Sequence, residues 1–258
     1  TGYGIFNLCK NIGFKNEEAI YCAIIFLFIP AVSFSTFFIS TDLFLLLFWT
    51  LSLNELIKII NSPNTRRFIV LGIMLGLAFL SKYAAVYFLL CMFILFIFDR
   101  DFREIIIANI YGLVLCLLII VLIIVPNLIW NINNDWVTLY HTSDNANLGN
   151  TEISIWRGVV FLFIQIMMIG PFLFLDNVIN YKKIKIDRNQ KLFLVFSLPI
   201  FLIVIIEAII VRANANWAAP ALISFFLFLY IGTYKLRSFF YKINIYFNFI
   251  FCFIFFIL

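Results

Sequence analysis

Long apolar stretches separated by short polar connections make up almost the whole chain. Most of them approach the roughly 20 residues that an α-helix needs to cross a bilayer, and none alternates like a membrane β-strand. We therefore expect an all-α, polytopic membrane bundle of about nine transmembrane helices. The expected spans are residues 19–39, 43–60, 68–81, 84–98, 105–129, 153–180, 191–211, 217–234 and 239–258.

The composition also indicates a membrane protein. Of the 258 residues, 65% are hydrophobic and 12% charged, about half the charged share of a soluble domain. No linker, internal repeat or low-complexity segment is visible, so residues 1–258 are expected to form a single transmembrane domain. The five cysteines have no metal-like or paired spacing, which argues against a disulfide or a cysteine metal site.

Basic residues are distributed unevenly between the two predicted faces of the membrane. If the spans alternate in direction, all but three of the 18 lysines and arginines fall on one face, which the positive-inside rule makes cytoplasmic. The net charge of +5 therefore reflects orientation and does not indicate nucleic-acid binding. The exceptions, Lys82, Arg157 and Arg212, fall on the outer face, where they are candidates to bind an anionic partner.

The longest polar interval, residues 130–152, is predicted to be a loop on the same outer face. It holds the only histidine, His141, and the acidic Asp144. An imidazole near carboxylates suits acid–base chemistry, but structural hydrogen bonding and contact with a substrate or phosphate are alternatives for His141. Trp130 and Trp136 are typical of the aromatic belt at a membrane interface.

Two charged residues lie at the ends of predicted spans. Asp42 opens a span after Ser40 and Thr41, where a carboxylate either caps the helix and suits its dipole or orients a polar substrate. Lys82 ends a span, where its ammonium either snorkels to the headgroups or holds a lipid phosphate.

A later outer connection carries Arg212, whose guanidinium is suited to bind a phosphate through two parallel hydrogen bonds. Asn216 adds an amide donor nearby. Glu207 lies about one helical turn before Arg212 inside an apolar stretch, and it is either an internal partner of this arginine or part of a functional site.

Five short motifs occur in the same order as in a known family. This order closely resembles the bacterial dolichyl-phosphate-mannose–protein mannosyltransferase-like proteins, which are GT-C-fold glycosyltransferases related to the aminoarabinose transferases of lipid A. The resemblance covers roughly residues 20–225. The motifs are Ser40–Asp42, Gly72–Tyr83, Pro126–Asn131, Trp136–Asn147 and Asn216–Pro220.

The resemblance implies a multi-pass enzyme of the bacterial inner membrane with its site on the periplasmic face. Such an enzyme transfers a sugar from a polyprenyl-phosphate-linked donor to lipid A, a polysaccharide or a protein. Its partners are the donor, a lipid or glycan acceptor and membrane lipids, without nucleic acid. Lys82 matches the span-end lysine near the carrier phosphate, and Asp42 the span-opening aspartate. His141, Asp144 and Asn145 match the outer loop, and Arg212, Asn216 and Trp217 the later outer connection.

The resemblance also places the catalytic carboxylate in a first outer loop, and we expect this chain to begin after that loop. The catalytic base is then expected outside this sequence, with Asp42 as the one catalytic candidate inside it. No cofactor is implied with certainty. Asp135, Asp144 and Glu152 leave a divalent metal open, but they form no recognisable metal motif.

Two other functions remain open from the sequence. A transporter or flippase for an anionic lipid-linked substrate would use the same outer cations, although it should show internal repeats and polar residues at mid-membrane. A non-catalytic remnant of a split glycosyltransferase would keep the motifs and lose the base.

Overall fold

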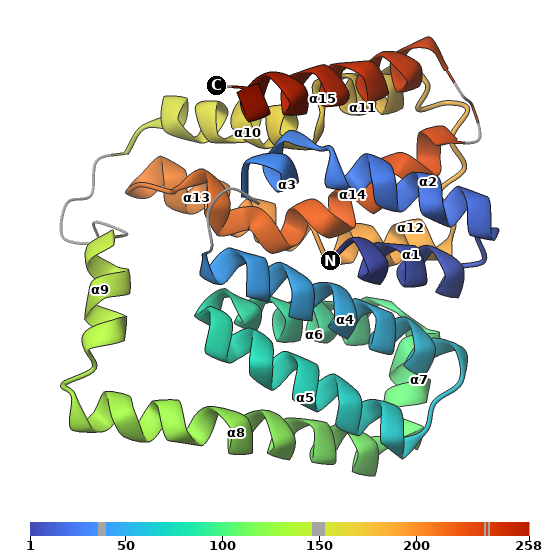
Figure 1. Cartoon of the computed structure of the whole chain (residues 1–258). Coiled ribbons are helices and arrows are strands. Elements are labelled where there is room, and N and C mark those ends of the chain that lie inside the picture. The colour runs from blue at the N-terminus through green and yellow to red at the C-terminus, as the bar shows by residue number, and fades with distance from the viewer. Residues whose placement is uncertain (36–39, 146–152, 235, 237, 258) are drawn as a thin grey trace.

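The computed structural model describes residues 1–35, 40–145, 153–234, 236 and 238–257, and these residues form helices and no β-strand (Figure 1). The predicted all-α class is confirmed. The helices are α1 (Gly2–Asn11), α2 (Asn16–Leu27), α3 (Pro30–Ser35), α4 (Thr41–Asn61), α5 (Thr65–Ser81), η1 (Tyr83–Ala85), α6 (Val86–Phe98), α7 (Arg100–Ala108), α8 (Ile110–Asn133), α9 (Val137–Asn145), α10 (Ile155–Ile169), α11 (Pro171–Ile179), α12 (Arg188–Val195), α13 (Leu198–Ile210), η2 (Ala215–Ala218), α14 (Ala219–Tyr234) and α15 (Phe239–Ile257).

Within the described residues, four helical stretches are long and apolar enough to cross a membrane, and up to six if each of two bent helix pairs is one span. The chain is therefore a multi-pass membrane protein. The predicted number of nine spans is not confirmed. The four stretches are α4, α8, Arg188–Ile210 and Ala215–Tyr234.

Local backbone geometry bends two of the apolar regions. Residues 153–180 were expected to be one span, but α10 and α11 meet at 98° where Gly170 has φ +117° and Pro171 starts the next helix. α6 and α7 meet at 108° at Asp99, whose side chain caps α7 by accepting the Phe102 amide at 2.8 Å. An average of hydrophobicity does not reveal the first bend, whereas the second lies where the predicted span 84–98 ends.

The described part of the polar interval, residues 130–145, is largely helical. α8 continues to Asn133, and after a short turn α9 spans Val137–Asn145, so the prediction of a loop is wrong for these residues. Residues 146–152, including the predicted metal candidate Glu152, lie outside the described part.

Close packing of α5 on α8 follows from two glycines. A side chain at Gly72 would lie 2.7 Å from the backbone oxygen of Cys116, and one at Gly76 would lie 2.7 Å from the side chain of Ile123. Glycines one helical turn apart thus let the two helices approach closely, as their spacing predicts.

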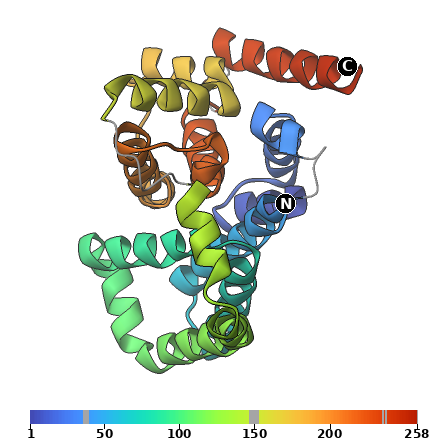
Figure 2. The ribbon, with the colours of Figure 1, turned by 90° about the vertical axis from the view of Figure 1, so that its left-hand side faces the viewer.

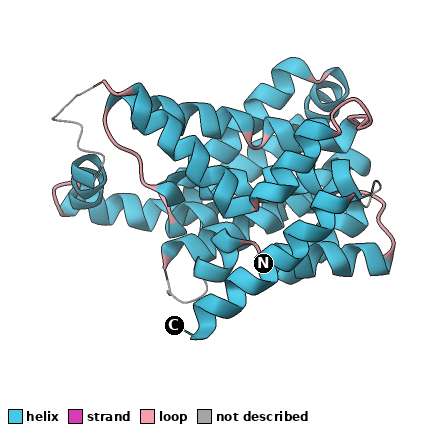
Figure 3. Cartoon of the chain, turned by 90° about the horizontal axis from the view of Figure 1, so that it is seen from above, coloured by secondary structure: helices cyan, strands magenta, loops and turns pink. Residues whose placement is uncertain are grey.

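The polar segments of interest meet at one end of the helical bundle. α4 and α10 begin, and α5, α8 and α13 end, on the left-hand side of Figure 1. Viewed from that side, α9 crosses the end of the bundle between α8 and α10 (Figure 2). From above, the described chain is helical apart from short connections (Figure 3).

An aromatic core fixes the helices behind this end. The buried Trp49 ring of α4 lies 5.0 Å from Phe88 of α6, and Phe88 lies 4.8 Å from Phe196 at the end of α12. Edge-to-face packing of this kind adds to the free energy gained by apolar burial. This packing therefore fixes the position of α4 relative to α6 and α12.

Candidate functional site

Asp42 lies in the first turn of α4 and is 9% exposed. Its carboxylate accepts a hydrogen bond from Lys82 Nζ at 2.7 Å through Oδ1, and another from Asn216 Nδ2 at 2.7 Å through Oδ2. These three residues, here called the Asp42 cluster, are 40 and 174 positions apart in the chain. The fold thus brings together three of the residues that the sequence analysis singled out separately.

Lys82 is placed by the end of α5. Its backbone leaves the helical conformation (φ −163°, ψ 135°), while its amide still bonds the Ala78 carbonyl at 3.0 Å. The side chains of Lys82 and Asp42 are 26% and 12% exposed, so the ion pair is largely shielded from solvent. The sequence is compatible with snorkelling and with phosphate binding by Lys82, but it gives no sign of the pairing with Asp42.

Asn216 is held by the short turn η2 between α13 and α14. The adjacent Ala215 carbonyl accepts a hydrogen bond from Gln165 of α10 at 3.0 Å. Gln165 is itself 2% exposed, so the turn is fixed from a buried position. This arrangement directs Asn216 to Asp42 rather than leaving it in a free loop.

A small pocket of about 30 Å³ adjoins the Asp42 cluster. Asp42 and Asn216 provide its polar lining, and the remaining walls are apolar. Those walls come from α2, the α2–α3 connection, α3, α4, α10 and α14 and are Phe26, Ile29, Ala31, Val32, Leu46, Met168, Ala219, Leu222 and Ile223.

The chemistry available to the cluster follows from its donors. An ammonium has three N–H groups and a side-chain amide two, and the contacts with Asp42 use one of each. Within the described residues the other N–H groups of Lys82 and Asn216 have no protein acceptor. An anion placed beside them would receive charge-assisted hydrogen bonds, and the carboxylate of Asp42 is able to accept a proton or orient a hydroxyl.

Two other candidates in this region lie outside the cluster. Arg212 is exposed, and among the described residues it forms no ion pair, so its proposed pairing with Glu207 is not found. Trp217 is partly buried and packs on the hydrophobic core. Its ring therefore helps to hold η2 against the core.

The predicted loop residues are placed on α9. His141 and Asp144 are exposed there, and the side chain of Asn145 lies outside the described part. Over the described residues, no three histidine, cysteine or acidic side chains are grouped in a way that would hold a metal ion. Asp135 and Asp144 thus belong to no such group among the described residues.

A second polar network was missed by the sequence analysis. Tyr83, next to Lys82, bonds Asn127 and Asn131 of α8 and contacts Thr138 of α9. Asn131 is fully buried. The available signal was the spacing of two asparagines four residues apart in an apolar helix, which places both on one helix face.

Comparison with known proteins identifies the class. The family model for dolichyl-phosphate-mannose-protein mannosyltransferase matches residues 1–130, half of the chain, and includes Asp42, Lys82 and Tyr83. The chain therefore belongs to this family, as its motifs indicated. No solved structure matches it.

A curated relative adds detail. Over 203 residues, 76% of this chain, the sequence is 30% identical to the lipid A galacturonosyltransferase RgtD of Rhizobium johnstonii. The chain spans about two fifths of the length of that relative, since the match covers 41% of it.

Proposed function

We propose that this chain is part of a glycosyltransferase that moves a sugar from a polyprenyl-phosphate donor to lipid A or a related glycan acceptor. The protein would lie in the bacterial inner membrane, with the Asp42 cluster at the periplasmic face. The observation that carries this proposal is the cluster itself, in which an ion pair and an amide from three distant segments meet at a membrane-helix end in a family of sugar transferases.

The depth of the cluster in the membrane supports a lipid phosphate as its ligand. Trp130 near the end of α8 and Trp156 near the start of α10 are 48% and 71% exposed. Both helix ends lie at the same end of the bundle as the start of α4 (Figure 1). Exposed tryptophans typically mark the interface between hydrocarbon and water, which is where the phosphate of a polyprenyl carrier lies.

In the proposed reaction an acceptor hydroxyl attacks the anomeric carbon of the donor sugar. The bond from that carbon to the phosphate oxygen breaks, and polyprenyl phosphate leaves with the bonding electrons. Lys82 and Asn216 donate hydrogen bonds to the leaving phosphate, and such preorganised donors are usually the largest electrostatic contribution to catalysis. The proton of the acceptor passes to a carboxylate base elsewhere in the longer protein, while Asp42 orients Lys82.

Arg212 would also take part in binding the donor. Its guanidinium is exposed near η2, and it would add a second, bidentate contact to the carrier phosphate. Trp217 would only support η2, since its ring packs on the core. His141, Asp144 and Asn145 would serve the acceptor.

Replacing the lysine in the complete protein tests the proposal. Lys82→Met should lower sugar transfer to lipid A by about 100-fold or more, because the ammonium facing the leaving phosphate is lost. Lys58→Met, at the opposite end of α4, is the matched control and should transfer at the wild-type rate. The assay is mass spectrometry of lipid A after incubation of membranes with the lipid-linked donor, normalised to the amount of inserted protein.

Each result has a clear meaning. Wild-type transfer by Lys82→Met would refute the proposed phosphate site. If the wild-type protein moves the intact lipid-linked sugar across vesicle membranes without transferring it, the protein is a transporter and the enzymatic proposal is wrong.

A further inference from the structure

The hydroxyl of Tyr83 is the centre of a network that joins three helical segments. It donates to Asn127 Oδ1 at 2.8 Å, accepts from Asn131 Nδ2 at 3.2 Å and lies 3.3 Å from Thr138 Oγ1. Thr138 also donates to Asn131 Oδ1. The first turn of α9 is therefore attached through side chains both to α8 and to the residue that follows Lys82.

The turn between α8 and α9 is strained. Asp135 and Trp136 are consecutive non-glycine residues with positive φ, 52° and 55°. This conformation is unfavourable for a bulky side chain and persists only where surrounding contacts enforce it. The amide of Trp136 bonds the carbonyl of Asn131 at 2.9 Å, and the Tyr83 network holds α9 on the other side of the turn.

The exposed surface of α9 has the chemistry of a sugar-binding surface. Tyr140 is 65% exposed, and His141, Thr142 and Asp144 are exposed beside it, together with the apolar Val137 and Leu139. Between residues 130 and 145 there is no lysine or arginine. A surface with an aromatic ring, hydroxyl and imidazole groups but no cation suits the hydroxyls of a saccharide and is unsuited to a phosphate.

We propose that α9 binds the saccharide headgroup of the acceptor, and that Tyr83 is a positioning residue that holds this surface beside Lys82. The inference rests on the proposed function, because it divides that site between Lys82 on the donor side and α9 on the acceptor side. Tyr83 acts through α9 and touches neither substrate.

Removing one oxygen atom tests the positioning role. Tyr83→Phe in the complete protein keeps the ring and loses the three hydroxyl contacts. The KM for lipid A should rise about tenfold, because the acceptor surface is no longer held in place, while the KM for the lipid-linked donor stays at its wild-type value. Thr138→Val should reproduce this change and Thr138→Ser should not. Tyr111→Phe, an exposed tyrosine at the opposite end of α8, is the matched control.

Hydrogen exchange gives a readout that does not depend on catalysis. In the wild-type protein, lipid A should slow amide exchange in residues 137–145, and phosphatidic acid, which carries a phosphate and no sugar, should not. In Tyr83→Phe these amides should exchange faster without any lipid, whereas the amides in the middle of α8 should be unchanged.

Several results would overturn the inference. Equal protection by phosphatidic acid would assign α9 to phosphate binding. Unchanged exchange in Tyr83→Phe would show that the hydroxyl does not hold α9, and equal rises in KM for donor and acceptor would contradict the division of the site. Absence of sugar transfer by the wild-type protein, with protection by lipid A intact, would reject the proposed reaction and leave the acceptor surface standing.

Discussion

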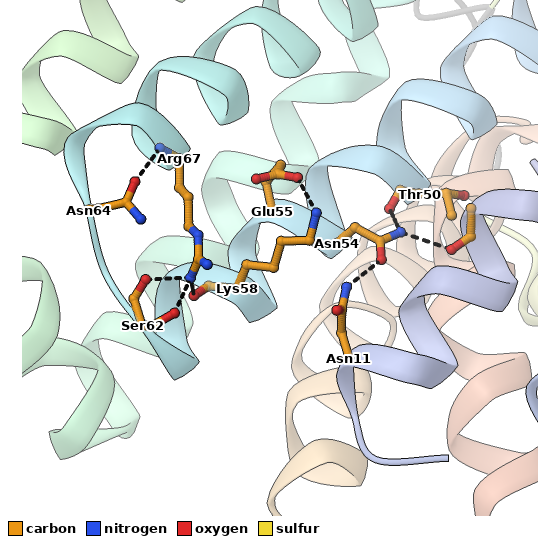
Figure 4. Close-up of polar contacts among 9 residues, drawn as sticks. Asn11, Thr50, Asn54, Glu55, Lys58, Ser62, Asn64 and Arg67 are labelled. Carbon is orange, nitrogen blue, oxygen red and sulfur yellow. Dashed lines mark hydrogen bonds and ion pairs between the residues drawn. The ribbon is translucent and has the colours of Figure 1, made fainter. Parts of the chain in front are cut away.

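The two ends of α4 carry polar clusters that are built differently. At the C-terminal end, polar side chains satisfy backbone groups and connect neighbouring helices (Figure 4). Asn54 donates to the carbonyl of Gly4 in α1 at 2.9 Å, and Arg67 of α5 donates to the carbonyl groups of Lys58 and Ser62. These contacts satisfy carbonyl groups near helix ends and hold neighbouring helices together. The polarity of these residues is therefore explained by the fold.

At the N-terminal end the contacts are between side chains alone. Lys82 and Asn216 both bond the carboxylate of Asp42, and neither uses its side chain on a backbone group of the described chain. Charges in a membrane protein are costly and are retained mainly where they have a task. Polarity at the C-terminal end of α4 thus supports the fold, whereas the N-terminal end retains side-chain donors that the described chain does not use, as the proposed ligand site requires.

The largest effect should come from the charge at the N-terminal end. Asp42→Asn keeps the size of the side chain but removes the anion that orients Lys82, so transfer should fall by about 100-fold. The loss of transfer should exceed what any fall in the thermal unfolding midpoint in detergent accounts for, so transfer is expressed per folded molecule. Glu55→Gln, an acidic residue of the same helix, is the control and should keep wild-type transfer. Normal transfer by Asp42→Asn would remove the distinction between the two ends.

At the other end a buried amide should affect stability instead. Asn54 is 3% exposed and also accepts from Asn11 at 3.0 Å, so Asn54→Leu removes both of the hydrogen bonds by which this side chain joins α4 to α1. The free energy of unfolding should fall by about 2–3 kcal/mol, measured by denaturant titration in detergent. Transfer per folded molecule should stay at the wild-type level. A loss of transfer without a loss of stability would contradict this assignment.

A smaller loss of stability is expected at Arg67. Arg67→Ala removes the donor that bonds carbonyl groups at the end of α4, and because that end is exposed, water replaces most of the interaction. The expected loss is about 1 kcal/mol, visible as a lower thermal midpoint. Arg67→Lys should recover part of it. A loss as large as that of Asn54→Leu would show that the arginine is more than a helix-end donor.

The smallest effect should follow from breaking the ion pair between Lys58 and Glu55. Its atoms are 2.7 Å apart, but the two side chains are 38% and 15% exposed and lie three positions apart on one helix. Such pairs contribute about 0–0.5 kcal/mol. Lys58→Met should therefore unfold within the error of the wild-type midpoint. A clear shift would mean that this end, too, carries an energetically important charge.

The sequence predicted the helical class and indicated Asp42, Lys82 and Asn216 as separate candidates. It could not predict that the three meet, because the contact between Asp42 and Asn216 joins segments 174 residues apart and depends on how whole helices pack. Local pattern contains no information about such a distance.

The missed features have equally specific causes. The hydrophobic average over residues 153–180 hides Gly170 and Pro171, two residues that are enough to turn the chain. Within residues 130–152 the number of polar residues suggested a loop, yet α9 is helical and is held by Thr138 through a tyrosine more than 50 positions earlier. Polarity indicates exposure to water or a ligand; it does not by itself indicate the absence of a helix.

The one-sided packing of α8 has a consequence for how the protein is made. The apolar part of α8 has a mean hydropathy of 3.0, and only 17% of it is buried inside the protein. The apolar part of Ala215–Tyr234 has a lower mean hydropathy of 1.5, and 72% of it is buried. A helix with the first profile partitions into the bilayer on its own during synthesis, because lipid replaces water along most of its surface. Most of the surface of the later helix is covered by other helices and not by lipid. Its stable insertion therefore depends on helices that are already in the membrane. Co-translational assembly of this chain is thus expected to proceed from a self-inserting helix to one that is recruited by its neighbours.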